Sequence, residues 1–376
     1  MTRIIFAAGG HVNFDLDEDE EMLKALVERF VDDHYDPEMR REYLAEPLGY
    51  SQKNWALLGE LGLTALPFAP EHGGIGVGPT GLAVVFEALG RGLVVEPLAE
   101  SIVLAGGLFE RLASDTLKAE WMDSLVTGER RLALAHREAA ARDNWTFVET
   151  VARDGRVTGE KSLVVAGTGV DAYLVSARIS GAADDPEGIE LFLVLASDPG
   201  LSVTPWRLID GSVGATVTLD GADAIPLGGS VADIEAMRTR TSLAQSAEAL
   251  GIMERLFADT LDYLKTRKQF GTALGSFQAL QHRMAAQYSN IEQARALLTL
   301  AMMTDPASDD GRKAVDGARA FIAETAITLG HEMIQMHGGM GVTDELIIGH
   351  GHKRLMMLAR WPESPVASLD RFAGVS

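Results

Sequence analysis

Residues 263–278 read YLKTRKQFGTALGSFQ, a stretch that ends one long helical pattern and begins another. Before it, apolar residues recur every three or four positions and so share one helix face; they are Leu243, Ala247, Leu250, Met253, Phe257, Leu261 and Leu264. After it, the same spacing runs from Phe277 to Met302, behind a predicted N-cap at Ser276. Two long helices joined by so short a connection predict antiparallel neighbours in a helical bundle.

A third helical pattern leads into QMHGGMG at residues 335–341 and is expected to end at Gly338 and Gly339, where a left-handed cap forms easily. Paired glycines also let bare backbone N–H groups approach a phosphate, although a plain helix end is their commoner use. In the first stretch, Arg267, Phe270 and Gln278 place a cation, a ring and an amide at one helix–helix corner. Each of these also has a purely structural interpretation, as a solvated charge or a core ring.

Outward from the bundle, the rest of the chain divides into two more regions. The N-terminal part has helical spacing, for example at Met22, Leu23, Leu26, Val27 and Phe30. The middle part carries short runs rich in Val, Leu and Tyr, separated by Gly, Asp and Pro, which predict short strands in a β-barrel or sandwich. The predicted fold is mostly α with a β insert: an N-terminal helical domain at 1–130, a middle β-domain at 131–230, and a C-terminal four-helix bundle at 231–376.

Composition narrows the possible functions. The chain has 376 residues and a formal charge of −21. The electrostatic field of so negative a protein repels phosphates and anionic lipids, and therefore disfavours nucleic-acid and membrane-surface partners. It contains no cysteine, which excludes disulfides, thiolate metal ligands and Cys nucleophiles. His350 and His352 lie two residues apart and do not share a helix face, so no metal site is predicted. No signal peptide or membrane-spanning run is recognised, and we expect a soluble, cytoplasmic protein.

Four motifs in order carry a family resemblance. R-x-x-F-G-x-x-x-x-x-F-Q begins at Arg267, and Q-x-x-G-G-x-G follows at Gln335. WALLGELGL at 55–63 and PEHGGIGVG at 70–78 precede them in the N-terminal region. Together they resemble the FAD-dependent acyl-CoA dehydrogenase family over nearly the whole chain, and the helical, β, helical order agrees with that resemblance.

The resemblance implies a cofactor, a reaction and a set of binding residues. FAD would lie between the β-domain and the bundle, with a neighbouring subunit completing its site. Arg267 would pair with the pyrophosphate and Gln278 would hydrogen-bond along the dinucleotide. Phe270, Gln335, Gly338 and Gly339 would line its adenosine side. The reaction it implies is α,β-dehydrogenation of an acyl-CoA thioester: a carboxylate base removes the α proton and a β hydride passes to the flavin.

Two segments depart from the family pattern. Where many relatives have T-E-P-x-x-G-S-D against the flavin ring, residues 137–144 read REAAARDN, and K-x-W-I-T-N-G is replaced by KSLVVAG at 161–167. Relatives carry the catalytic Glu at one of two positions. In this chain those positions hold Thr241 and Pro362, and neither residue is an acid. Glu363, next to Pro362, is the remaining candidate base, or else a surface acid between two prolines.

This mixture resembles the small subunits of heteromeric acyl-CoA dehydrogenases of the pimeloyl-CoA and steroid side-chain types. The resemblance implies a heterotetramer with a second acyl-CoA dehydrogenase subunit, in which the partner would supply the catalytic Glu and an electron-transferring flavoprotein would accept electrons. Two alternatives stay open. In the first, the chain is a flavin-free structural or regulatory member of the fold. In the second, it is a self-sufficient homotetramer that uses Glu363 as its catalytic base. The sequence does not identify the acyl chain.

Overall fold

The computed structural model describes residues 15–375, which fold into an N-terminal helical region, an open sheet and a C-terminal bundle. The N-terminal region contains α1 (Glu18–His34), α2 (Pro37–Ala45), α3 (Gln52–Glu60), η1 (Pro70–His72), α4 (Pro79–Gly92), the π-helical η2 (Ala99–Gly106), α5 (Gly107–Leu112) and α6 (Asp115–Val126). Several starts are encoded locally: Asp17 and Glu20 form a capping box on α1, and Pro37 and Pro79 occupy first turns. This order confirms the predicted helical, β, helical arrangement.

The middle region is one sheet. Its strands are β1 (Leu132–Ala135), β2 (Val151–Arg153), β3 (Arg156–Val165), β4 (Ala172–Arg178), β5 (Ile189–Leu195), β6 (Leu201–Arg207), β7 (Val213–Asp223) and β8 (Ile225–Gly228). They pair in the order β6-β7-β3-β2-β4-β5-β8, with β1 parallel to β4. The predicted β-domain is present, but of its two predicted forms, a barrel or a sandwich, the closed barrel does not form, because the end strands β6 and β8 do not pair and the described sheet stays open.

The C-terminal region consists of α7 (Val231–Thr266), the hairpin of β9 (Lys268–Gln269) and β10 (Thr272–Ala273), η3 (Leu274–Ser276), α8 (Gln278–Met303), α9 (Asp309–His337), η4 (Gly338–Val342), α10 (Ile347–Leu358) and α11 (Pro365–Ala373).

Two predicted helix caps differ in detail from those in the structure. Phe277, not Ser276, is the N-cap of α8, and the Ser276 hydroxyl donates to the Ala273 carbonyl instead. Gly338 ends α9 at φ 62° and ψ −143°, which only glycine adopts readily but which is not the left-handed helical cap.

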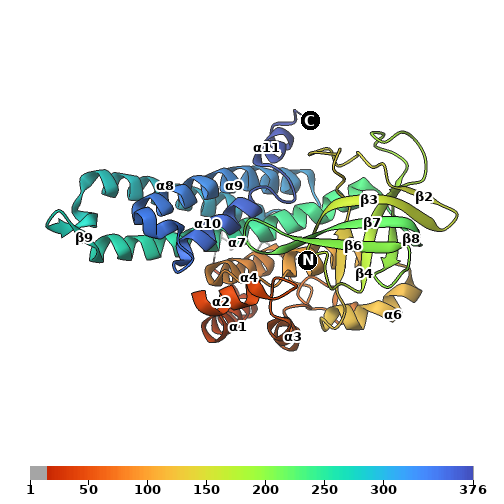
Figure 1. The fold of residues 1–376 in the computed structure, drawn as a ribbon, viewed down its shortest axis with the longest axis horizontal. Coiled ribbons are helices and arrows are strands. Elements are labelled where there is room, and N and C mark those ends of the chain that lie inside the picture. Colours follow the sequence, from red (N-terminus) through yellow and green to blue (C-terminus); the bar gives the residue numbers. More distant parts are fainter. Residues whose placement is uncertain (1–14, 376) are drawn as a thin grey trace, which may run out of the picture.

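The three regions are arranged along one long axis, with the sheet at one end and the β9–β10 hairpin at the other (Figure 1). The N-terminal helices lie against α7 in the middle, where backbones approach so closely that only glycine fits. A Cβ on Gly251 of α7 would lie 2.0 Å from the Glu87 carbonyl oxygen of α4. One apolar core is shared by the N-terminal helices, the bundle and part of the sheet, including Leu132, Leu174 and Leu191, and a second lies within the sheet. Within residues 15–375, no helix is both long and apolar enough to cross a membrane.

Candidate functional site

The two glycine-containing motifs meet at one end of the bundle. The ring of Tyr263, in the last turn of α7, stacks on His337 at the end of α9, with centroids 4.3 Å apart. On the same end, Arg283 of α8 and Glu332 of α9 form an ion pair at 2.6 Å. Arg267 follows directly as the C-cap of α7, and Gly338 as the C-cap of α9. Segments far apart in the sequence are thus brought to one surface.

This end of the bundle exposes groups that can bind an anion. The residues Arg267, Phe270, Gln278, Gln335, Gly338 and Gly339 are all exposed. The Arg267 guanidinium has no hydrogen-bond or ion-pair partner in the described part of the chain, and a Cβ on either glycine would meet no atom within 4 Å. The Gly338 N–H already donates to the Gln335 carbonyl, so a guanidinium and two side-chain amides are the exposed groups suited to a pyrophosphate. They fit the dinucleotide half of FAD.

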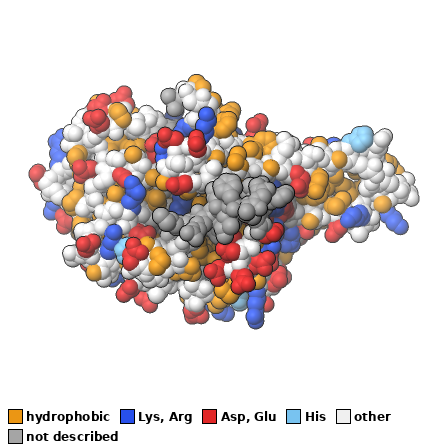
Figure 2. All heavy atoms as spheres, turned by 180° about the vertical axis from the view of Figure 1, so that it is seen from behind, with side chains coloured by type: hydrophobic (Ala, Val, Ile, Leu, Met, Phe, Trp, Pro, Cys, Tyr) orange, Lys and Arg blue, Asp and Glu red, His pale blue; other side chains and the backbone are white. Residues whose placement is uncertain are grey.

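The hairpin at the tip presents an exposed aromatic ring, that of Phe270, whose centroid lies 6.2 Å from that of Phe277 in an edge contact. Phe270 and Gly271 both have positive φ, 53° and 81°, as a two-residue type I′ turn requires. This turn leaves Phe270 89% exposed, which is unusual for a large apolar ring in a monomer. Figure 2, which views the molecule from behind, shows the bundle as a narrow arm with Lys and Arg side chains at its end and hydrophobic atoms along it. The tip therefore offers both charge and apolar area to another molecule.

The opposite half of the expected site, between the sheet and α7, is filled by protein. Trp145 comes from the loop after β1, is 8% exposed, and stacks on His136 with centroids 4.9 Å apart and planes inclined by 21°. The guanidinium carbons of Arg137 and Arg238 each lie 5.6 Å from its ring centroid. These are stacking and cation–π contacts on a buried indole. The flavin-ring half of the cofactor does not fit the space that this chain itself leaves here.

Behind Trp145, Glu138 is the acid that this chain retains from the family motif, and it is hydrogen-bonded within the β-region. Its carboxylate accepts hydrogen bonds from Lys161 at 2.7 Å and from the Thr150 hydroxyl and backbone N–H. Lys161 also donates to the Ser176 hydroxyl, which bonds His136. Burial lowers the pKa of Lys161 to about 8 and that of His136 to about 3. His136 is therefore neutral, and the wall facing Trp145 is a fixed hydrogen-bond network.

Glu363 lies in a buried ion cluster. Arg238 Nη1 is 2.6 Å from each of its carboxylate oxygens, Arg371 binds both oxygens, and the Ser368 hydroxyl donates to Oε1 at 2.9 Å. Burial raises the pKa of Glu363, but the charges of Arg238 and Arg371 outweigh burial and lower it. A carboxylate that is fully bonded, with a lowered pKa, is poorly suited to accept a proton. At the other expected base position, the Thr241 hydroxyl donates to the Met237 carbonyl.

A second group of buried charges was not predicted from the sequence. Glu96 and Glu100, beside and within the π-helical η2, line a water-sized cavity together with Glu248 and Arg354. Arg354 binds Glu248 at 2.6 Å and Asp210 at 3.1 Å and lies 4.0 Å from Glu100, and so joins the bundle, the β6–β7 hairpin and the N-terminal helices. Burial raises the pKa of both Glu96 and Glu100 to about 7. An acid within the apolar run PLAESIVLAGGL, residues 97–108, was the available signal.

Replacing Glu100 with Gln tests this raised pKa. Its folded pKa, about 7, exceeds the ordinary value of 4.5, so the folded state binds the proton more tightly. The stability that Glu100 contributes is complete below pH 4.5 and is lost as the pH rises through 7. We expect Glu100→Gln to match the unmutated protein near pH 4.5 and to exceed its free energy of unfolding by about 3 kcal/mol at pH 8. Urea unfolding across this range measures it, with exposed Glu42→Gln as the control. Equal pH profiles for all three proteins would contradict the assignment.

Comparison with known proteins places these features in a family. Residues 17–129 match the family model "Acyl-CoA dehydrogenase, N-terminal domain" and residues 231–362 match "Acyl-CoA dehydrogenase, C-terminal domain". The acyl-CoA dehydrogenase FadE27 of Mycobacterium tuberculosis is 32% identical, over 88% of this chain and 90% of its own.

Two solved heteromeric relatives have the same fold. The ChsE4-ChsE5 complex from Mycobacterium tuberculosis aligns with a TM-score of 0.87 and 28% identity, over 96% of this chain and 98% of that one. A variant of the Tcur3481-Tcur3483 steroid ACAD aligns with a TM-score of 0.84 and 28% identity, over 95% of this chain and 97% of that one.

Proposed function

The chain belongs to the acyl-CoA dehydrogenase family, whose cofactor is FAD, and we propose that it acts as one subunit of a heteromeric member. In this role it binds the pyrophosphate and adenosine side of an FAD whose ring lies in the partner subunit. The partner also supplies the catalytic Glu. The reaction is α,β-dehydrogenation of an acyl-CoA thioester to the 2-enoyl-CoA.

The proposal rests on the contrast between the two halves of the site. At the bundle tip, Arg267 has no partner in the described chain and the glycines at the end of α9 are unobstructed. Between the sheet and α7, Trp145 is stacked and buried. A chain that had lost every use for flavin would have no need of an open, donor-rich tip. A self-sufficient enzyme would need the second half open and a carboxylate able to take a proton.

Each group of residues then has a defined task. Arg267 and Gln278 bind the dinucleotide, and the unobstructed backbone at Gly338 and Gly339 packs beside it together with Phe270 and Gln335. FAD, when bound, supplies the hydride acceptor. An electron-transferring flavoprotein is the expected oxidant of the reduced flavin. A steroid-derived acyl thioester is the substrate class we would test first, because one of the solved heteromeric relatives is described as a steroid ACAD.

A visible absorption spectrum combined with the mass in solution tests the proposal. We expect the chain purified alone to be colourless, and the complex with its partner dehydrogenase subunit to carry one FAD for every two chains. One FAD per chain and turnover without any partner would instead establish the self-sufficient enzyme. A complex in which removing this chain leaves flavin content and turnover unchanged would establish the flavin-free structural role.

A further inference from the structure

The last helix, α11, is amphipathic, but its polar side faces the protein and its apolar side faces outward. On the inner side, Ser368 is fully buried and its hydroxyl donates to Glu363 at 2.9 Å, while Arg371 binds Asp316 of α9 at 2.8 Å. The outer side carries an apolar stripe of residues three positions apart, each 41–73% exposed: Val366, Leu369, Phe372 and, just after the helix, Val375. A helix that ends its packing at solvent has the opposite orientation.

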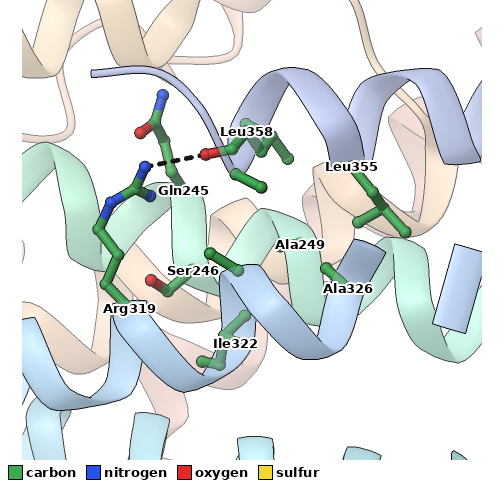
Figure 3. Close-up of a pocket in the computed structure, with 10 residues that line it drawn as sticks. Gln245, Ser246, Ala249, Arg319, Ile322, Ala326, Leu355 and Leu358 are labelled. Atoms are coloured by element: carbon green, nitrogen blue, oxygen red, sulfur yellow. Dashed lines mark hydrogen bonds between the residues drawn. The ribbon is translucent and has the colours of Figure 1, made fainter. Parts of the chain in front are cut away.

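Contacts within the chain fix this orientation. Arg319 of α9 is 2% exposed and donates to the backbone carbonyls of Leu358, Trp361 and Glu363, in the segment that leads into α11. Figure 3 shows the first of these bonds, which joins α9 to the end of α10. Turning α11 over to bury its apolar stripe would break the ion pairs of Arg371 and leave buried carboxylates without it. The polar side therefore stays on α9, and the stripe stays available to another protein, as contiguous exposed apolar residues often are.

The stripe borders the closed half of the flavin site. In Figure 1, α11 lies on the outside of the bundle toward the sheet, away from the β9–β10 tip. Glu363, directly before α11, binds Arg238 of α7 at 2.6 Å. The guanidinium carbon of Arg238 is in turn 5.6 Å from the Trp145 ring centroid. The partner of α11 is therefore expected to lie against the junction of the sheet and α7.

Symmetry indicates which protein that partner is. Two homologous subunits that pair about an approximate two-fold axis make reciprocal contacts. In the proposed heteromer, the tip of this chain reaches a flavin at the sheet–α7 junction of the partner, so the partner's tip reaches the same junction of this chain. Trp145 closes that junction, and direct apolar contact replaces the dinucleotide there. Two copies of this chain would also cover α11, but Arg267 of each copy would face a junction without a flavin ring.

We propose that the apolar stripe of α11 is the docking surface for the bundle tip of the second dehydrogenase subunit, an assignment that rests on the proposed function. Val366 and Leu369 form its centre, because Phe372 is partly occupied by α9: a Cβ on Gly317 would lie 2.8 Å from its ring. The matching surface on the partner's tip is expected to be apolar. Phe270, 89% exposed at the tip of this chain, is a group of that kind.

A single introduced thiol tests whether α11 is covered, because the chain has no cysteine of its own. Leu369→Cys on α11 and the control Met22→Cys on α1 each replace an exposed apolar residue of a helix. In the complex with the second dehydrogenase subunit, we expect a maleimide to label Leu369→Cys at least about tenfold more slowly than Met22→Cys, since a covered site reacts only when the contact opens. In the chain purified alone, the two rates should be similar. The intact mass of this chain measures its labelling separately from any cysteine of the partner.

The outcomes separate this assignment from the proposed function. Equal labelling of the two variants, in a complex that still carries one FAD for every two chains, would overturn the docking surface and leave the proposed function standing. Protection of Leu369→Cys in the chain purified alone would also overturn it, because a second copy would then be the occupant. One FAD per chain and turnover without a partner would overturn the proposed function and, with it, the assigned occupant.

Leu369→Asp gives a second readout. A carboxylate without a partner in a buried apolar contact should raise the dissociation constant of the two chains by roughly 10- to 100-fold, as measured by sedimentation. Because Leu369 is exposed in the single chain, its unfolding midpoint should stay close to that of the unmutated protein. Met22→Asp adds the same charge on α1 and should leave association unchanged. Equal association of the Leu369→Asp and Met22→Asp proteins would overturn the proposal.

Discussion

Glu363→Gln is expected to lower the free energy of unfolding by about 3–5 kcal/mol, because it removes the negative charge from the centre of a buried cluster. Glu363 is fully buried and binds Arg238 and Arg371, while the Arg319 guanidinium donates to its backbone carbonyl. Without the carboxylate, these guanidinium groups repel one another with no water to screen them. Much of the effect should appear in the docking of α11 on α9, since Arg371 and Ser368 are both on α11.

Urea or thermal unfolding measures this loss, and Glu120→Gln provides the control. Glu120 is exposed on α6, so its change should stay within about 0.5 kcal/mol. The self-sufficient alternative makes a different prediction for Glu363→Gln: turnover is lost while stability is nearly unchanged, as expected of a base in an open site. A stability change as small as that of the control would contradict the structural role of Glu363 argued above.

The arrangement of the fold could be predicted because it depends on local patterns. Apolar spacing located α7, α8 and α9, and turn residues separated the strands. The open sheet could not be predicted, because pairing between β6 and β8 depends on twist and on what covers the ends, which no local pattern records. Ser276 failed as a cap for a similar reason: η3 tightens the chain ahead of α8 and redirects its hydroxyl to Ala273.

The candidate site divides in the same way. Arg267, Gln278 and the two glycines belong to contiguous motifs, so a single sequence identified them, although their flavin contacts remain predictions. Trp145 could not be assigned to the ring site, because its contact with Arg238 joins residues that are distant in the sequence. Glu363 was ambiguous for the same reason: its neighbour Arg238 is 125 residues away, and only the fold shows that its charge is already compensated.

Arg267→Ala is expected to weaken FAD binding by the heteromeric complex by about 10- to 100-fold. A charge-assisted hydrogen bond is worth about 1.5–3 kcal/mol, so the loss of one such bond to a pyrophosphate corresponds to about this factor. Arg267→Lys keeps the charge but loses the planar fork, so its affinity should fall between those of the unmutated and Ala proteins. The measurements are the flavin-to-protein absorbance ratio after gel filtration and a titration of the apo complex with FAD.

The structure makes this loss interpretable as a binding effect. Because the Arg267 side chain is exposed and has no partner in the described chain, removing it should leave the unfolding midpoint nearly unchanged, unlike removal of Glu363. Lys265→Ala removes the same charge from a nearby exposed side chain, which pairs with Asp262. General electrostatic attraction between the tip and a polyanionic cofactor would weaken FAD binding equally in both variants. A loss confined to Arg267→Ala requires a specific contact, and flavin retention equal to that of Lys265→Ala would remove Arg267 from the site.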